Sequence, residues 1–412
     1  FIITRSDGNF LLQNGTITSQ ENSRQHNLYI NSATKISDTE FVMATSSIGC
    51  VVVNIKNNAW QHFSIDQGLQ HNNALSVFMD ANKNLWTGLN SGISYISYNS
   101  AIRYLQIGKT NNPSGYSTRI FNNRLYLATT NGVYSAPVTI NNSKVNVLKD
   151  DFTLVNNTRN SEAWNLREIN GHLLLGNDNG SYEIQGNNAV LLSGGVGSWY
   201  FLPLSAVSPV PDIITGTYNG IKLLRYEGGN FKDKGKIEGI RDSYRFMALD
   251  HNEDIWASHP YRGIYRFRLS PDKKKYISNL YTVNDGLPST LNNFVFKIKN
   301  QIVFATTRGI YEYNASTNRF VPSRFLSAVF GETKVRYLTE DAAGNIWFCN
   351  EKGTGVVHPS QTDQYTVTYF PELASQILLG FENIYPYNQE NVFIGSERGL
   401  IHLDYQKYSS VK

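Results

Sequence analysis

The side chains best suited to chemistry in this 412-residue chain are aromatic and polar residues that occur in turns and loops. Flat aromatic rings stack on sugar rings, and arginine, asparagine and histidine hydrogen-bond to hydroxyl and carboxylate groups. The candidate ligand-binding residues are Trp164, Trp199, Tyr200, Tyr218, Asn219, Tyr244, Arg245, His259, Tyr261 and Arg262, with Tyr116 and Asn293 in similar positions. The alternative for the tryptophans is packing between strands, and for Tyr261 and Arg262 it is simple exposure to solvent.

The sequence contains no specific catalytic motif. Its eight histidines are scattered, without the His-x-x-x-His or Glu-x-x-His spacing of a local metal site. A Gly-x-Ser-x-Gly elbow and a phosphate-binding loop are also missing from the sequence. We therefore expect no catalytic residue, no metal and no cofactor. Carboxylates that converge from distant parts of the chain, as in a glycosidase, remain an alternative.

Composition narrows the class of protein. Hydrophobic residues make up 41% of the chain, which excludes a disordered protein. The net charge of +4 is too small to indicate a nucleic-acid partner.

No apolar run is long enough for a membrane helix, so we expect membrane contact only through segments outside the chain. The start at Phe-Ile-Ile-Thr predicts a mature or excised fragment. Cys50 and Cys349 form no disulfide pattern, and we expect free thiols, with Cys349 buried.

A repeat fills the chain, and this repeat must position the candidate residues. Each copy has an apolar strand, a tight polar turn that ends in glycine, and a second apolar strand. The turn glycines are Gly49, Gly92, Gly132, Gly180, Gly220, Gly263, Gly309, Gly355 and Gly399. Their average spacing of about 44 residues is typical of a β-propeller blade with four antiparallel strands. The sequence therefore predicts an all-β propeller of about nine repeats.

Three repeats share an Asp-x-x-x-Asn/Asp-Leu/Ile-Trp pattern, at Asp80 to Trp86, Asp250 to Trp256 and Asp341 to Trp347. The acidic residue closes the turn after the first strand through side-chain hydrogen bonds to the backbone. The tryptophan then fills the wedge between neighbouring blades, so we interpret it as a core residue. We expect residues 102–105 to form the outer strand of the second repeat.

Two domain organisations fit this pattern. In the first, residues 1–412 form one ring of nine repeats, and residues 1–13 supply the missing outer strand of the last blade. Nine-bladed rings are rare. In the second, residues 1–92 are the end of a preceding propeller, and residues 93–412 form a propeller of seven blades.

The candidate residues are expected to surround one mouth of the propeller. The turn after the second strand and the loop into the next blade lie at the same end of the ring, and most candidates fall there, in the fourth to sixth repeats. The turn from His259 to Arg262 is longer than its neighbours and should protrude. Arg245 and Arg262 favour an acidic sugar, bound through bidentate contacts to carboxylate or sulfate.

The repeats resemble the two-component regulator propeller family. The matching segments are Asp66-Gln67-Gly68-Leu69 through Asn73, Asp80, Leu85-Trp86-Thr87-Gly88 and Gly92-Ile93, then Asp285-Gly286-Leu287-Pro288 through Asn293, Phe304 to Thr307 and Gly309-Ile310, and Asp341 to Trp347. The stretch from Phe381 to Gly395 resembles the final blade that precedes a triple-tyrosine β-sandwich in this family. The middle repeats, around Asn177 and Tyr218, depart most from the pattern.

The resemblance implies a periplasmic sensor region of a hybrid histidine kinase or a related membrane-anchored regulator, in a family that often senses oligosaccharides. We therefore expect a non-catalytic propeller that binds an oligosaccharide or another small ligand and can form a homodimer. Two alternatives stay open. One is a propeller glycosidase or polysaccharide lyase, and the other is a protein-interaction scaffold.

Overall fold

The chain forms two compact units, Phe1–Ala101 and Ile102–Lys412, in the computed structural model. The structure describes residues 2–3, 9–13, 16–19, 29–56, 59–107, 112–141, 143–147, 152–272, 274–359 and 365–411. β-Strands dominate, as predicted. The helical segments in the described residues are short: η2 (Ile65–Gln67), η4 (Val283–Asp285), α1 (Ser327–Phe330), η5 (Pro371–Leu373) and α2 (Tyr405–Val411). No helix in this part of the chain is long and apolar enough to cross a membrane.

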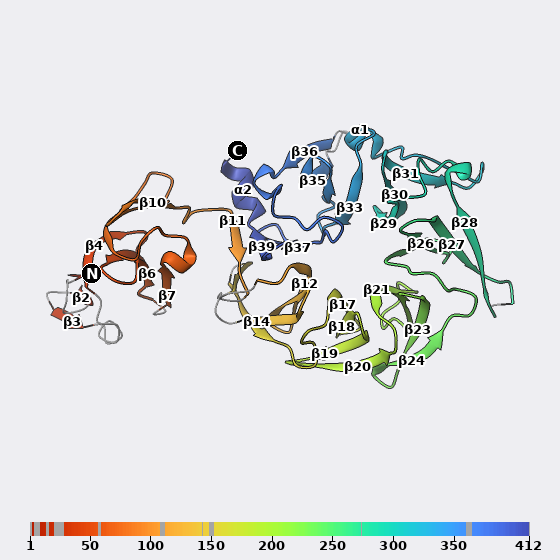
Figure 1. The fold of residues 1–412 in the computed structure, drawn as a ribbon, viewed down its shortest axis with the longest axis horizontal. Coiled ribbons are helices and arrows are strands. Elements are labelled where there is room, and N and C mark those ends of the chain that lie inside the picture. The colour runs from red at the N-terminus through yellow and green to blue at the C-terminus, as the bar shows by residue number, and fades with distance from the viewer. Residues whose placement is uncertain are drawn as a thin grey trace. The chain divides into compact units, whose positions relative to one another are not determined.

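Residues 102–412 contain seven antiparallel sheets, the blades, placed around a common centre (Figure 1). Blades 1 to 4 are β12–β16 (Gly115–Phe121, Arg124–Thr129, Gly132–Asn141, Lys144–Val147, Thr153–Leu154), β17–β20 (Ala163–Ile169, His172–Asn177, Gly180–Gln185, Asn188–Gly194), β21–β24 (Ser198–Pro203, Asp212–Thr217, Gly220–Glu227, Asn230–Lys236) and β25–β28 (Phe246–Leu249, Ile255–His259, Gly263–Leu269, Tyr276–Tyr281). Blades 5 and 6 are β29–β32 (Phe294–Ile298, Gln301–Thr306, Gly309–Asn314, Arg319–Pro322) and β33–β36 (Val335–Glu340, Ile346–Asn350, Gly353–Pro359, Tyr365–Tyr369). The first strand of each blade is innermost, and apolar clusters fill the space between neighbouring blades.

Blade 7 joins the two ends of this unit in one sheet. It consists of β37 (Ile384–Asn388), β38 (Asn391–Ser396) and β39 (Gly399–Leu403), and its outer strand is β11 (Ile102–Leu105), which pairs antiparallel with β39. Two expectations were therefore wrong. Residues 102–105 do not complete the second repeat, and residues 1–13 do not close the last blade. Pairing β11 with β39 covers the exposed edge of the last sheet with the chain segment next to blade 1.

Residues 1–101 form smaller sheets. One has three strands, β1 (Ile2–Ile3), β2 (Asn9–Gln13) and β3 (Thr16–Ser19), and another has four, β4 (Ile30–Lys35), β5 (Glu40–Thr45), β6 (Cys50–Asn54) and β7 (Ala59–Phe63). The third sheet, β8 (Ala74–Met79), β9 (Leu85–Leu89) and β10 (Gly92–Ile96), has only three strands. The expectation of nine four-stranded sheets is thus corrected, because β11 belongs to blade 7. Since β10 pairs with β9, the boundary between units falls after residue 101 and not after residue 92.

The Asp–Trp pattern has the predicted turn function and one additional bond. Asp250 accepts backbone N–H groups of its turn through Oδ1, at 2.8 and 3.0 Å, while Oδ2 accepts the indole N–H of Trp256 at 2.9 Å. The same indole bond joins Trp347 to Asp341 and Trp86 to Asp80. Trp256 and Trp347 are buried, which confirms their assignment to the core, whereas Trp86 is 43% exposed. Both cysteines are free and buried.

Two glycines show how tightly the blades fit. The turn glycine of blade 6 is Gly353, with φ of +133°, and not Gly355, which lies inside β35 against Phe348. Gly216 on β22 faces the backbone of blade 4: a Cβ atom there would lie 2.0 Å from the carbonyl oxygen of Tyr244. Backbone cannot yield as a flexible side chain does, so this position requires glycine.

We expect Gly216→Ala to destabilise residues 102–412 by roughly 1–3 kcal/mol, because the added methyl group forces blades 3 and 4 apart. Gly194→Ala is the matched control, since a Cβ there meets only Leu191, at 3.4 Å. Urea denaturation of the two variants checks this. Equal midpoints for both would show that the blades are not held at this distance.

Candidate functional site

Irregularities in the innermost strands bring three aromatic residues to one mouth of the channel. The ladder between the first and second strands skips Tyr116 in blade 1, Trp164 in blade 2 and Trp199 in blade 3. A residue in such a bulge lacks a cross-strand partner, and the bulge turns its side chain away from the regular alternation. The three side chains then contact one another instead of packing into the wedges between blades.

These rings form a continuous cluster with two more. The centroid of the Trp164 ring lies 5.1 Å from that of Tyr116 and 4.7 Å from that of Trp199. Tyr218, in the turn before β23, lies 4.7 Å from Trp199 and accepts the indole N–H of Trp164 at 2.8 Å. Phe381, in the segment before β37, stacks on Trp164 at 5.5 Å. We call these five residues the aromatic cluster.

A guanidinium group borders the aromatic cluster. Arg245, just before β25, lies 4.2 Å from the centroid of Phe381 and 5.7 Å from that of Trp199. Its Nη1 donates to the carbonyl oxygen of Gly380 at 2.6 Å. Burial lowers the pKa of Arg245 to about 10, so the group still carries its charge at neutral pH. The same burial raises the pKa of Tyr116 to about 12, which keeps its hydroxyl protonated.

Four residues of the aromatic cluster, all except Tyr218, line one end of a cavity of about 770 Å³, within the ordinary range of ligand pockets of about 300–1,000 Å³. Deeper in the cavity lie Arg119 on β12, Arg167 on β17 and Tyr200 on β21. Arg167 donates to the Tyr200 hydroxyl at 2.6 Å and to the Phe201 carbonyl at 2.7 Å. The opposite end is formed by turns of blades 3 and 4, residues 203–207, 249–251 and 253. The cavity therefore follows the central channel of the propeller.

The structure brings only some of the predicted residues to this cavity. Trp164, Trp199, Tyr200 and Arg245 line it, and Tyr218 joins it through the aromatic cluster. The remaining five do not line it: Asn219, Tyr244, His259, Tyr261 and Arg262.

Each of these residues has another environment. His259 accepts the backbone N–H of Tyr261 within its own turn, at 3.1 Å. Tyr244 is only 2% exposed and packs on Tyr265 and Phe267, because its side chain points between blades 3 and 4. Tyr261 is 75% exposed, as expected for a protruding turn. Arg262 forms an ion pair with Asp242 at 3.1 Å, so its charge is already balanced. Asn219 is exposed, and the additional candidate Asn293 is buried.

The most important residues missed by the sequence reasoning are Arg119, Arg167 and Phe381. A signal for the arginines was available: Tyr116 to Arg119 and Trp164 to Arg167 share an aromatic-x-x-Arg spacing at the same place in successive blades. Phe381 had no comparable signal, because it lies on an irregular segment whose path depends on the fold of blade 7.

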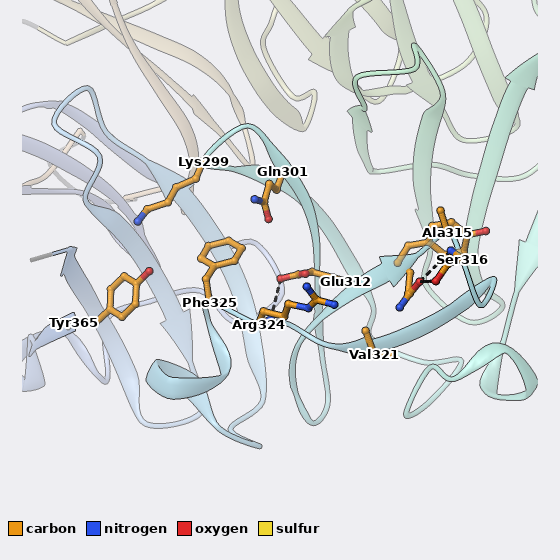
Figure 2. Close-up of a pocket in the computed structure, with 11 residues that line it drawn as sticks. Lys299, Gln301, Glu312, Ala315, Ser316, Val321, Arg324, Phe325 and Tyr365 are labelled. Atoms are coloured by element: carbon orange, nitrogen blue, oxygen red, sulfur yellow. Dashed lines mark hydrogen bonds between the residues drawn. The ribbon is translucent and has the colours of Figure 1, made fainter. Parts of the chain in front are cut away.

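A second cavity, of about 610 Å³, lies on the outer part of blades 5 and 6 (Figure 2). Lys299 lies 5.2 Å from the centroid of Tyr365, and Glu312 accepts the backbone N–H of Arg324 at 3.1 Å. Tyr365 borders residues 360–364, which are outside the described residues. We place the candidate site in the channel, where the bulged aromatic residues converge.

No family model matches the chain, and no curated protein matches it. Solved structures are similar to it. The extracellular domain of the hybrid two component system BT3049 from B. thetaiotaomicron matches with a TM-score of 0.67 and 18% identity, over 97% of this chain and 54% of that one. Two structures of the extracellular domain of BT4673 from the same organism, described as a one component and a hybrid two component system, match with TM-scores of 0.52 and 0.51, at 14% and 16% identity. The first match covers 92% of this chain and 52% of the BT4673 chain, and the second covers 94% and 54%.

The chain spans about half the length of these domains. The similar proteins belong to the class that the repeat motifs resemble, so two independent comparisons, one of sequence pattern and one of structure, agree. The chain has the β-propeller fold of the extracellular domains of two-component sensor systems.

Proposed function

We propose that the chain is an extracytoplasmic, periplasmic part of a signal-transduction receptor, and that its propeller binds an oligosaccharide without catalysing a reaction. The similar structures are extracellular domains of signalling systems, which supports a sensing role. The oligosaccharide is inferred from the chemistry of the channel. On this proposal, ligand binding in the propeller is the input, and the output lies in another part of the receptor.

The observation that carries this proposal is the aromatic cluster at one end of the channel. Trp164 and Trp199 are half-buried and contribute faces to a cavity of ligand size. Aromatic faces beside hydrogen-bonding groups are the usual chemistry of a sugar site, because a sugar ring has apolar C–H faces and polar edges. Tyr200 and Arg167 line the same cavity and supply such polar groups.

Binding accounts for the channel better than catalysis does. Glycosidases use paired carboxylates. Here the middle of the cavity carries guanidinium groups and phenols. Of the four lining carboxylates, Asp250, Glu253, Glu340 and Glu382, three already have partners: Asp250 accepts the indole N–H of Trp256, Glu340 accepts the backbone N–H of Lys299, and Glu382 is held by Arg336 at 2.5 Å. This arrangement supports a binding module over the alternative of a glycosidase or lyase.

For residues 1–101 we propose the end of a preceding propeller. The sheet β8–β10 lacks the outer strand that β11 gives to blade 7. Phe78, Ile93 and Tyr95 on this sheet are 50–66% exposed, an unusual amount for large apolar side chains in neighbouring strands. A further strand and blade would cover them, as in blades 1 to 7.

A thermal-shift screen of the chain against a library of glycan oligosaccharides tests the proposed function, because a ligand that binds only the folded state raises the melting temperature. With a ligand identified in this way, we expect Trp164→Ala and Trp199→Ala each to weaken binding by about tenfold or more, since buried aromatic residues are typical binding anchors. Tyr261→Ala, which removes an exposed ring outside the cavity, should leave affinity unchanged. If all three variants bind equally well, the ligand does not lie on the aromatic cluster.

A further inference from the structure

Two arginines deep in the channel have charges that the described protein does not balance. Arg119 and Arg167 extend from the innermost strands of blades 1 and 2 into the cavity. Every ion pair of the described residues lies elsewhere, so neither guanidinium group has a carboxylate partner in this part of the chain. Arg262, which the sequence favoured for an acidic ligand, differs because it is paired with Asp242.

Most hydrogen-bond donors of the two guanidinium groups are also unused. A guanidinium group carries five N–H donors. Arg119 uses Nη1 for one bond, to the carbonyl oxygen of Thr118 at 2.6 Å, and it lies 4.6 Å from the ring centroid of Tyr385. Arg167 makes both of its bonds through Nη1. Among the described residues, its Nε and Nη2 have no hydrogen-bond acceptor.

The surroundings favour an external anion over an internal partner. Burial lowers the pKa of Arg119, and the nearby charge of Arg167 also lowers it, so an anion bound beside both groups would stabilise their charged forms. Burial raises the pKa of Tyr337, another lining residue, to about 12, so its hydroxyl stays a neutral hydrogen-bonding group.

Four carboxylates also line the cavity, at Asp250, Glu253, Glu340 and Glu382. Asp250 accepts hydrogen bonds from its own turn and from Trp256, and Glu382 is paired with Arg336. Glu340 accepts the backbone N–H of Lys299 at 2.7 Å, at the end of β33. These carboxylates belong to turns and to another ion pair, and they leave Arg119 and Arg167 without a partner.

We propose that Arg119 and Arg167 form an anion subsite of the channel, which selects oligosaccharides that carry a carboxylate or sulfate group. This inference rests on the proposed function, and it specifies the charge of the ligand. An anionic sugar stacked on the aromatic cluster extends its acid group inward to the two guanidinium groups. Planar N–H pairs match both carboxylate and sulfate oxygens, and Arg245 adds a third positive charge at the mouth.

Calorimetric titration of the intact 412-residue chain with matched probes tests the subsite. The carboxylate pair is trigalacturonate and the corresponding neutral trigalactoside. The sulfate pair is a sulfated galactan tetrasaccharide and its desulfated counterpart. We expect the anionic member of at least one pair to bind tenfold or more tightly than its neutral counterpart, and the pair that shows this identifies the acid group. This preference should decrease as the salt concentration rises.

Substitutions of the two arginines test whether they cause the preference for anionic probes. Arg119→Gln and Arg167→Gln should each reduce affinity for the anionic probe by about tenfold to a hundredfold, the scale of a charge-assisted hydrogen bond, with little effect on neutral probes. Arg119→Lys keeps the charge and should retain part of the preference, which separates loss of charge from loss of packing on Tyr385. Arg225→Gln, on the outer part of blade 3, is the control arginine and should change nothing.

The outcomes are distinct. Equal binding of anionic and neutral probes, or a preference that survives both glutamine substitutions, overturns the subsite and leaves the proposed oligosaccharide function intact. Failure of every probe to bind overturns the subsite, and if the glycan library also gives no thermal shift, the proposed function fails with it.

Discussion

Trp347→Ala is expected to destabilise residues 102–412 by about 3–5 kcal/mol, the usual cost of removing a large buried aromatic side chain. Trp347 is 1% exposed, and its ring contacts Phe370 at 5.9 Å and Tyr405 of helix α2 at 5.3 Å between centroids. The substitution leaves a cavity that the rigid strands of blade 6 cannot fill. It also leaves Asp341 without its indole donor.

Trp86 provides a matched control. It has the same sequence pattern and the same indole bond to an aspartate, but it is 43% exposed. Trp86→Ala should therefore lower the stability of its own unit far less. Scanning calorimetry of both variants measures the two effects. A loss in Trp86→Ala as large as that in Trp347→Ala would mean that the shared hydrogen bond, and not burial, determines the contribution of these tryptophans.

Acid should weaken the closure of blade 7 through His402. This histidine is 6% exposed on β39, opposite Arg103 of the closing strand β11, and its ring stacks on Phe393. Burial, with the Arg103 charge, lowers the pKa of His402 from 6.5 to about 4. Between pH 4 and pH 6.5, His402 binds a proton in the unfolded chain but not in the folded protein. Stability is therefore lost as the pH falls from about 6.5 to 4, by about 3 kcal/mol in total.

Urea denaturation at pH 7 and pH 4.5 measures this loss. His402→Gln removes the titrating group and should reduce the difference in unfolding free energy between the two pH values. Burial also lowers the pKa of His358 and His259, so a smaller acid effect should remain in the variant. His251→Gln, in an exposed turn, is the control. An unchanged pH dependence in His402→Gln would show that this histidine is not held neutral.

The sequence predicted the fold well because the propeller is built from local signals. Turn glycines and alternating strands recur along the chain, three repeats add an Asp–Trp turn, and each signal acts within about 44 residues. Ring closure was predicted poorly because it depends on a pairing between residues almost 300 positions apart, β11 with β39. Nothing in residues 102–105 distinguishes a strand that ends one repeat from a strand that completes another sheet.

The candidate site was also predicted only in part, because local sequence signals identify some of its residues and long-range structure determines the others. Trp164 and Trp199 were found because aromatic residues at the start of a strand are visible in the sequence. Tyr244 has the same pattern, but its side chain points between blades, because whether such a residue faces the channel depends on a bulge. Arg119 lies in the part of β12 that follows the bulge, and only the radial arrangement of blades places it with Arg167 in the lining of one cavity.

The central claim is that an oligosaccharide binds in the channel of this propeller, on the aromatic cluster. The most direct measurement is a crystal structure of the chain with the oligosaccharide that gives the largest thermal shift. The account predicts a sugar ring stacked on Trp164 or Trp199 with polar groups directed toward Arg119 and Arg167. A ligand bound outside the channel, with the aromatic cluster unoccupied, would contradict it.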